Sequence, residues 1–189
     1  DLKLVKVWDR NDLLKLFDRP AAEGLFCRVF NCFKSLEHDR QIGDRRRVNM
    51  AEMSYDGPSK HLPPGPLLCQ MSCKKFKEKV VASVTDRRDF YHQARVSKER
   101  AQTNVLPFRF SRQELAETKA LHEFDNEAKA KLVKDREIVG DHLAGERFAG
   151  AGEGQSSFFA GFASLFQGDH LGVEFALAAH QSLLEQADL

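Results

Sequence analysis

Hydrophobic residues occur in short clusters separated by polar stretches throughout the chain. Apolar and charged residues alternate over residues 2–7, which predicts a short strand. Capping residues then precede an apolar cluster at 13–17, which predicts a helix ending before Pro20. A further apolar cluster, at 25–33, fits either a helix or a strand.

Three later segments have clearer patterns. Residues 80–84 are apolar and largely β-branched without alternation, which predicts a strand covered on both faces. Ser111 and Glu114 form a capping box, which predicts a long, mostly charged helix from there to Gly140. The last helix is predicted to start near Gly172, because the residues after it place an apolar stripe on one face.

Two segments rich in glycine or proline separate these elements. Residues 55–66 are predicted to be a connector without regular structure. Residues 150–157 contain several glycines but lack the Gly-Lys-Ser/Thr ending of a phosphate-binding loop, so they are interpreted as a linker.

The predicted strand at 80–84 leads directly to Asp86. A carboxylate at the end of a buried strand is a rigidly held oxygen ligand, which suits Mg²⁺ bound to phosphates. From the pattern alone, Asp86 could instead cap the following turn. Residues 86–96, however, read Asp-Arg-Arg-Asp-Phe-Tyr-His-Gln-Ala-Arg-Val, and this segment resembles the first catalytic motif of retroelement reverse transcriptases.

This resemblance implies roles for several residues of the segment. Asp86 and the backbone of Arg87 would bind the two catalytic metal ions. The amides of Asp89 and Phe90 would approach the triphosphate of the incoming nucleotide. Tyr91 would act as the steric gate against the ribose 2′-hydroxyl, although Phe90 replaces the small residue that usually precedes this gate.

A second segment, 39–49, carries Arg40, Asp44, Arg46 and Asn49 at the spacing found in the fingers of the same family. Arg45 replaces the usual aromatic residue. The resemblance implies that Arg40 binds the triphosphate, for which a guanidinium fork is well suited, and that Arg46 supports the fingers or the template. Taken alone, the segment would be interpreted as a charged turn.

A third segment, 165–176, contains Gln167 and Gly168 before the predicted last helix. It resembles the Gln-Gly-Asp-Pro-Leu-Ser-Pro motif of the family, with His170 and Gly172 in place of a proline and a serine. The resemblance implies that Gln167 and Gly168 contact the base and sugar of the incoming nucleotide. Without it, a Gln-Gly turn before a helix has no functional meaning.

The composition is that of an ordinary soluble globular protein. Of 189 residues, 42% are hydrophobic and 30% charged, and the formal net charge of +1 gives no overall argument for nucleic-acid binding. The arginines nevertheless concentrate around the first two motifs. No segment predicts a membrane span or a signal peptide, so we expect an intracellular protein, nuclear or cytoplasmic and not secreted.

The four cysteines occur as two pairs, Cys27 with Cys32 and Cys69 with Cys73. Their spacings are close to those of zinc knuckles but lack the Cys-x-x-Cys form. Free thiols are therefore favoured over a shared zinc site, and both are favoured over disulfides.

Because the three motifs occur in the order found in reverse transcriptases, the resemblance implies an α+β fold. The expected architecture is the fingers and N-terminal palm of a right-hand polymerase, with a small, mainly antiparallel sheet backed by helices. Residues 1–97 would form the fingers and the start of the palm, 98–160 a mostly helical insertion or linker, and 161–189 a further palm segment. The oligomeric state stays open.

The resemblance implies an RNA-directed DNA polymerase. Such an enzyme transfers nucleotidyl groups from deoxynucleoside triphosphates to a primer on an RNA or DNA template with two Mg²⁺ ions, and pyrophosphate leaves. The chain starts at Asp1, ends in a helical pattern and contains no Asp-Asp pair, which the family needs. We therefore expect a fragment that is inactive alone. The alternatives are a non-catalytic nucleic-acid-binding domain, with or without zinc on the four cysteines, and a helical interaction domain.

Overall fold

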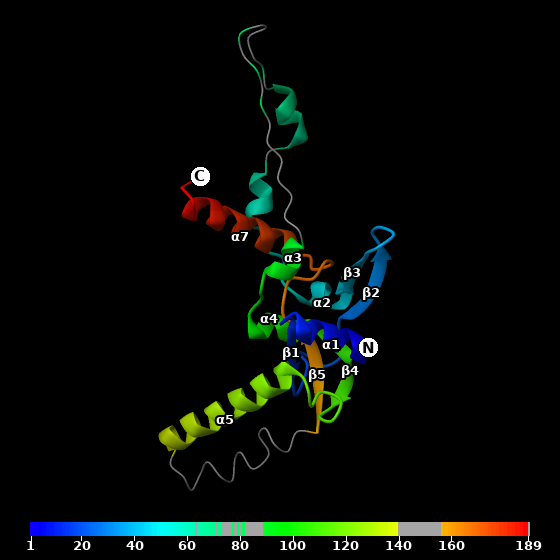
Figure 1. The fold of residues 1–189 in the computed structure, drawn as a ribbon. Helices are drawn as coiled ribbons and strands as arrows, with labels where there is room; N and C mark the ends of the chain where they lie inside the picture. The colour runs from blue at the N-terminus through cyan, green and yellow to red at the C-terminus, as the bar shows by residue number, and fades with distance from the viewer. Residues whose placement is uncertain are drawn as a thin grey trace.

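The computed structural model shows an α+β fold with a small antiparallel sheet and packed helices (Figure 1). It describes residues 1–62, 64–70, 72, 77, 79, 81, 89–139 and 156–188. The predicted strand at 80–84, apart from the exposed Val81, and the residues Asp86 and Arg87 therefore lie outside the described residues, as does most of the predicted linker at 150–157.

The main sheet has three strands in the order β1-β5-β4, all antiparallel to their neighbours. They are β1 (Leu14–Phe17), β4 (Val105–Ser111) and β5 (Ser157–Phe162). The central strand β5 is buried along almost its whole length, as expected for a strand covered on both faces. Because β4 pairs with β5, part of the segment expected to be an insertion contributes to this sheet.

A separate hairpin consists of β2 (Arg28–Phe33) and β3 (Asp39–Asp44). This resolves the open assignment of the cluster at 25–33. The short helix α2 (Arg46–Ala51) follows directly. The connector then contains two turns of 3-10 helix, Pro58–His61 and Gly65–Gln70, where no regular structure was expected.

The predictions for the first two elements were wrong. Residues Leu2–Arg10 form the helix α1, whose Val5 and Trp8 are buried. Positions three apart share one face of a helix, whereas a strand would have pointed these two side chains to opposite faces. The cluster at 13–17 forms the edge strand β1, which pairs with β5 and buries Leu14, Leu16 and Phe17.

The remaining helices are α3 (Phe90–Gln93), α4 (Lys98–Thr103), α5 (Lys119–Val139) and α7 (Gly172–Gln186). The predicted start of α7 is confirmed. The capping box at Ser111 and Glu114 does form, but as a turn ahead of the helix. The first amides of α5 are instead bound by the carboxylate of Asp9, which comes from α1.

The core lies where α1 packs on the main sheet. Trp8 contacts the rings of Phe162 and Phe166 with centroids 4.9 and 5.9 Å apart, and these two phenylalanines stack at 4.2 Å. Figure 1 shows α5 leaving the sheet at one end and α7 lying toward the other. None of the helices in the described part of the chain combines the length and apolar character that crossing a membrane requires.

Candidate functional site

The candidate site lies where the segment after β5 meets the end of the β2–β3 hairpin. Gly43, near the end of β3, donates its N–H to the carbonyl of Gln167 over 2.8 Å. Gly43 also lies against the ring of Phe166, and a Cβ added at position 43 would lie 2.8 Å from this ring. Two of the three motifs, about 120 residues apart in the sequence, are therefore in direct contact.

The residues Gln167 and Gly168, hereafter the Gln-Gly turn, approach the hairpin very closely. Gly168 has a φ of +114°, and a Cβ placed on it would lie 2.1 Å from the carbonyl oxygen of Gly43. Its own carbonyl accepts a hydrogen bond from Asn49 Nδ2 at 2.9 Å. Only glycine satisfies both the backbone conformation and the available space at position 168.

Arg40 lies on the outward face of the hairpin. Side chains alternate between the two faces of a strand, and the cross-strand register places Arg40 opposite Cys32, and Phe30 opposite Ile42. Arg40 is exposed, and Phe30 is 52% exposed. Three residues separate Arg40 from Gly43, which corresponds to about 10 Å along the strand and places the two positions on opposite faces of the hairpin.

Arg46 is also at the surface, where it forms two hydrogen bonds to the carboxylate of Asp44, both 2.8 Å long. This guanidinium lowers the pKa of Asp44 to about 2. Asp44 therefore stays ionised and keeps Arg46 at the end of the hairpin.

The α3 residues lie beside the start of α7. Tyr91 is half-buried, and a Cβ on Gly172 would come within 3.0 Å of its ring. Ser164 Oγ, just before the Gln-Gly turn, lies 2.6 to 2.8 Å from the carbonyl oxygens of Tyr91, His92 and Ala94, to any one of which its hydroxyl can donate. Asp89 is exposed and Phe90 half-buried. The structure thus brings Tyr91 toward the segment that carries Gln167 and Gly168.

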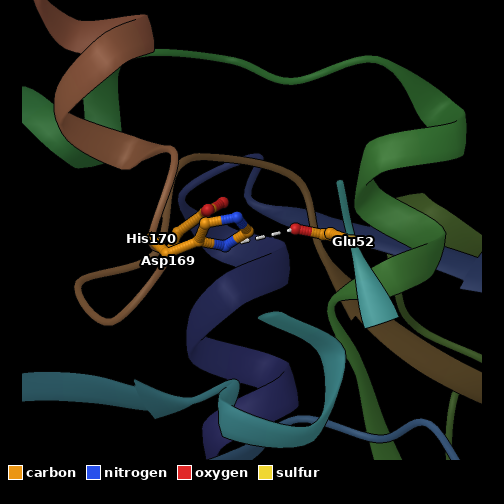
Figure 2. Close-up of side chains that lie close together, drawn as sticks. All are labelled: Glu52, Asp169 and His170. Atoms are coloured by element: carbon orange, nitrogen blue, oxygen red, sulfur yellow. Dashed lines mark ion pairs between the residues drawn. The ribbon is translucent and has the colours of Figure 1, made fainter. Parts of the chain in front are cut away.

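Behind the turn lies a network of buried and partly buried charges that the sequence patterns did not predict. Arg45 forms an ion pair with Glu52 at 2.6 Å, and Arg100 binds both Glu52, at 2.9 Å, and Asp169, at 2.6 Å. Figure 2 shows His170 directed toward Glu52, with its Nδ1 3.6 Å from the nearer carboxylate oxygen. Arg45 was visible in a run of three arginines, but such a run is normally solvent-exposed, and no local signal marks the buried member.

The residues Glu52, Asp169 and His170 lie close enough to share a metal ion. Two observations argue against that use. Both carboxylates are already paired with guanidinium groups, and the two arginines balance the two carboxylates without any further cation. Glu52 Oε2 has no hydrogen-bond partner among the described residues, but both oxygens of Asp169 bind Arg100 at 2.6 Å. A divalent cation would have to displace Arg100 from Asp169, so the cluster does not fit Mg²⁺.

Among the cysteines that the structure describes, Cys27 is buried while Cys32 and Cys69 are exposed. Burial raises the pKa of Cys27 to about 12, which disfavours the thiolate that zinc binds. Cys73 lies outside the described residues.

Comparison with known proteins finds no matching family model, no matching curated protein and no matching solved structure.

Proposed function

We propose that the chain is part of a retroelement reverse transcriptase, comprising the fingers and the first part of the palm. The observation that carries this proposal is the contact between the Gln-Gly turn and Gly43. The resemblance assigns Arg40 and the Gln-Gly turn to the same incoming nucleotide. Such a shared ligand requires the hairpin and the turn to be neighbours, and they are.

In this proposal each described residue has a defined task. Arg40, on the exposed face of the hairpin, binds the triphosphate through charge-assisted hydrogen bonds. Arg46, tied to Asp44, holds the fingers or the template. Gln167 and Gly168 contact the base and sugar. The amides of Asp89 and Phe90 approach the triphosphate, and Tyr91 limits the space around the ribose.

The proposed metal ligands, Asp86 and the backbone of Arg87, lie outside the described residues. When bound, two Mg²⁺ ions would stabilise the attacking and leaving oxygens of nucleotidyl transfer. The proposal assigns this role to Asp86 rather than to Glu52 and Asp169, whose charges are already neutralised by arginines.

Nucleotide binding to the purified chain tests the proposal. We expect saturable photocrosslinking of 8-azido-dATP in the presence of Mg²⁺, with unlabelled dATP as the competitor. Arg40→Met should weaken binding about tenfold or more, because a hydrogen bond to a charged group is worth about 1.5 to 3 kcal/mol. Arg112→Met is the matched control, since Arg112 pairs with Asp125 at the other end of β5. Absence of saturable labelling at millimolar nucleotide would overturn the proposal.

A second candidate function is non-catalytic binding of single-stranded nucleic acid. The outward face of the hairpin favours it, because Phe30 is flanked on that face by Arg28 and Arg40. An exposed ring can stack on a base while arginines bind the phosphates. Salt-sensitive binding of an oligonucleotide without any dATP labelling would select this candidate, and zinc analysis of the same sample would test its variant with zinc on the four cysteines.

A further inference from the structure

Arg45 is a buried cation at the junction between the hairpin, α2 and the Gln-Gly turn. Its side chain is fully buried, with 0% exposure. The guanidinium donates to Asn104 Oδ1, to Thr103 Oγ1 at 3.3 Å and to Glu52 Oε1 at 2.6 Å. These partners come from the last residue of α4 and the residue after it, and from the residue after α2, so Arg45 joins parts of the chain that are distant in sequence.

Arg45 also determines which way the amide of Asn49 points. Its Nε lies 3.4 Å from Asn49 Oδ1, and a guanidinium has only donors to offer. The oxygen of the amide must therefore face Arg45, and its NH₂ group faces away. That NH₂ group donates to the carbonyl of Gly168 at 2.9 Å.

A second connection runs through Asp169, which follows the Gln-Gly turn directly. One of its oxygens lies 3.9 Å from Arg45, and its side chain is fully buried. Its Oδ1 accepts the N–H of Leu171 at 3.0 Å, immediately before α7. Without Arg45, Glu52 and Asp169 would share the single cation of Arg100, and this arrangement would no longer be neutral.

We infer that Arg45 is the positioning residue of the Gln-Gly turn, acting through Asn49 and Asp169 on the backbone of Gly168. The inference rests on the proposed function at one point only, namely that the Gln-Gly turn contacts a nucleotide. Arg45 itself does not reach the surface, so its effect on a nucleotide must pass through the turn.

The experiment combines a local readout with a nucleotide-binding readout. The full 189-residue chain is labelled with ¹⁵N-glycine, and the amide signals and exchange rates of Gly43 and Gly168 are followed in Arg45→Ala and Asn49→Ala. Photocrosslinking of 8-azido-dATP with Mg²⁺ is measured on the same samples. Arg112→Ala is the control, because it removes another arginine–aspartate pair away from the turn.

We expect both variants to shift the signals of Gly43 and Gly168 and to accelerate exchange of the Gly43 amide about tenfold or more, since its hydrogen bond to Gln167 would weaken. Millimolar guanidinium should restore the wild-type signals in Arg45→Ala, whereas equal concentrations of sodium should not. The control should keep wild-type signals. If Arg45→Ala does not fold, Asn49→Ala still decides, because Asn49 is only half-buried and leaves the charge network intact.

The possible failures are distinguishable. Unchanged glycine signals in Asn49→Ala, or in a folded Arg45→Ala, would overturn the positioning role even if dATP labelling fell. Absence of dATP labelling in the unmodified chain would instead overturn the proposed function, and the glycine signals would still decide the role of Arg45.

Discussion

Replacement of Gly168 by alanine tests the close approach of the Gln-Gly turn to the hairpin. The added Cβ would lie 2.1 Å from the carbonyl oxygen of Gly43. An ordinary carbon–oxygen contact is about 3.3 Å long, so the turn would have to retreat by about 1.2 Å. Gly24 provides a matched control, because its φ of +77° is also positive but no atom lies within 4 Å of the place that a Cβ would occupy.

The magnitude follows from two contributions. An alanine at positive φ costs about 1 to 2 kcal/mol, and this contribution applies to both positions. A retreat of the turn would also break the hydrogen bonds from Gly43 to Gln167 and from Asn49 to Gly168, each worth about 0.5 to 1.5 kcal/mol. We therefore expect Gly168→Ala to lower the free energy of unfolding by about 2 to 5 kcal/mol, and Gly24→Ala by about 1 to 2 kcal/mol.

Urea unfolding followed by tryptophan fluorescence measures this difference. Trp8 is the single tryptophan and is 2% exposed, so its emission reports on the core. With a urea m-value of about 2 kcal/mol/M, a difference of about 2 kcal/mol between the variants separates their midpoints by about 1 M. Coinciding midpoints would refute the reasoning, because the two variants would then share only the cost of positive φ.

Three further outcomes are expected. Phe162→Ala should lower the free energy of unfolding by about 3 to 5 kcal/mol in urea titrations, because this fully buried ring packs on Trp8 and Phe166. Phe33→Ala should change the free energy of unfolding by less than about 0.5 kcal/mol, because that ring is 72% exposed. The folded-state pKa of Asp44, about 2, lies below the ordinary value of 3.8, so its contribution to stability is present above pH 3.8 and lost as the pH falls toward 2. Asp44→Asn should therefore make the free energy of unfolding less dependent on pH in that window. An unchanged pH profile would contradict the assignment. Maleimide labelling at about pH 8, mapped by mass spectrometry, should modify Cys32 and Cys69 well before Cys27, whose pKa of about 12 keeps it protonated; equal rates would show that Cys27 is accessible.

The sequence patterns predicted the later elements better than the first ones. The start of α7 and the existence of α5 followed from long periodic segments, which are the most informative kind. The assignments of α1 and β1 were reversed because each segment is short and fits both periods. Their types depend on tertiary contacts, namely the packing of Trp8 on Phe162 and the pairing of β1 with β5, which local patterns do not contain.

The candidate site shows the same division between local and tertiary information. The motifs indicated that Arg40 and the Gln-Gly turn belong together, but they gave no indication of what holds the turn in place. The burial of Arg45 depends on partners from α2, from the end of α4 and from the residue after the turn, none of which is close in sequence to another. The three consecutive arginines are chemically equivalent, and only tertiary contacts determine which of them is buried.

A charged network at this junction also has a physical consequence that an aromatic residue would lack. Buried ion pairs add little net stability compared with apolar packing, but a displaced partner leaves a buried charge uncompensated at a cost of about 3 to 5 kcal/mol. Any other position of the Gln-Gly turn would displace Asp169 from Arg100 and Arg45. The cost of that displacement disfavours such positions more strongly than a loss of apolar contacts would. Arg45 accordingly contributes more to the order of the turn than to the stability of the fold, which is why the glycine amides, and not the unfolding free energy alone, are the informative measurement.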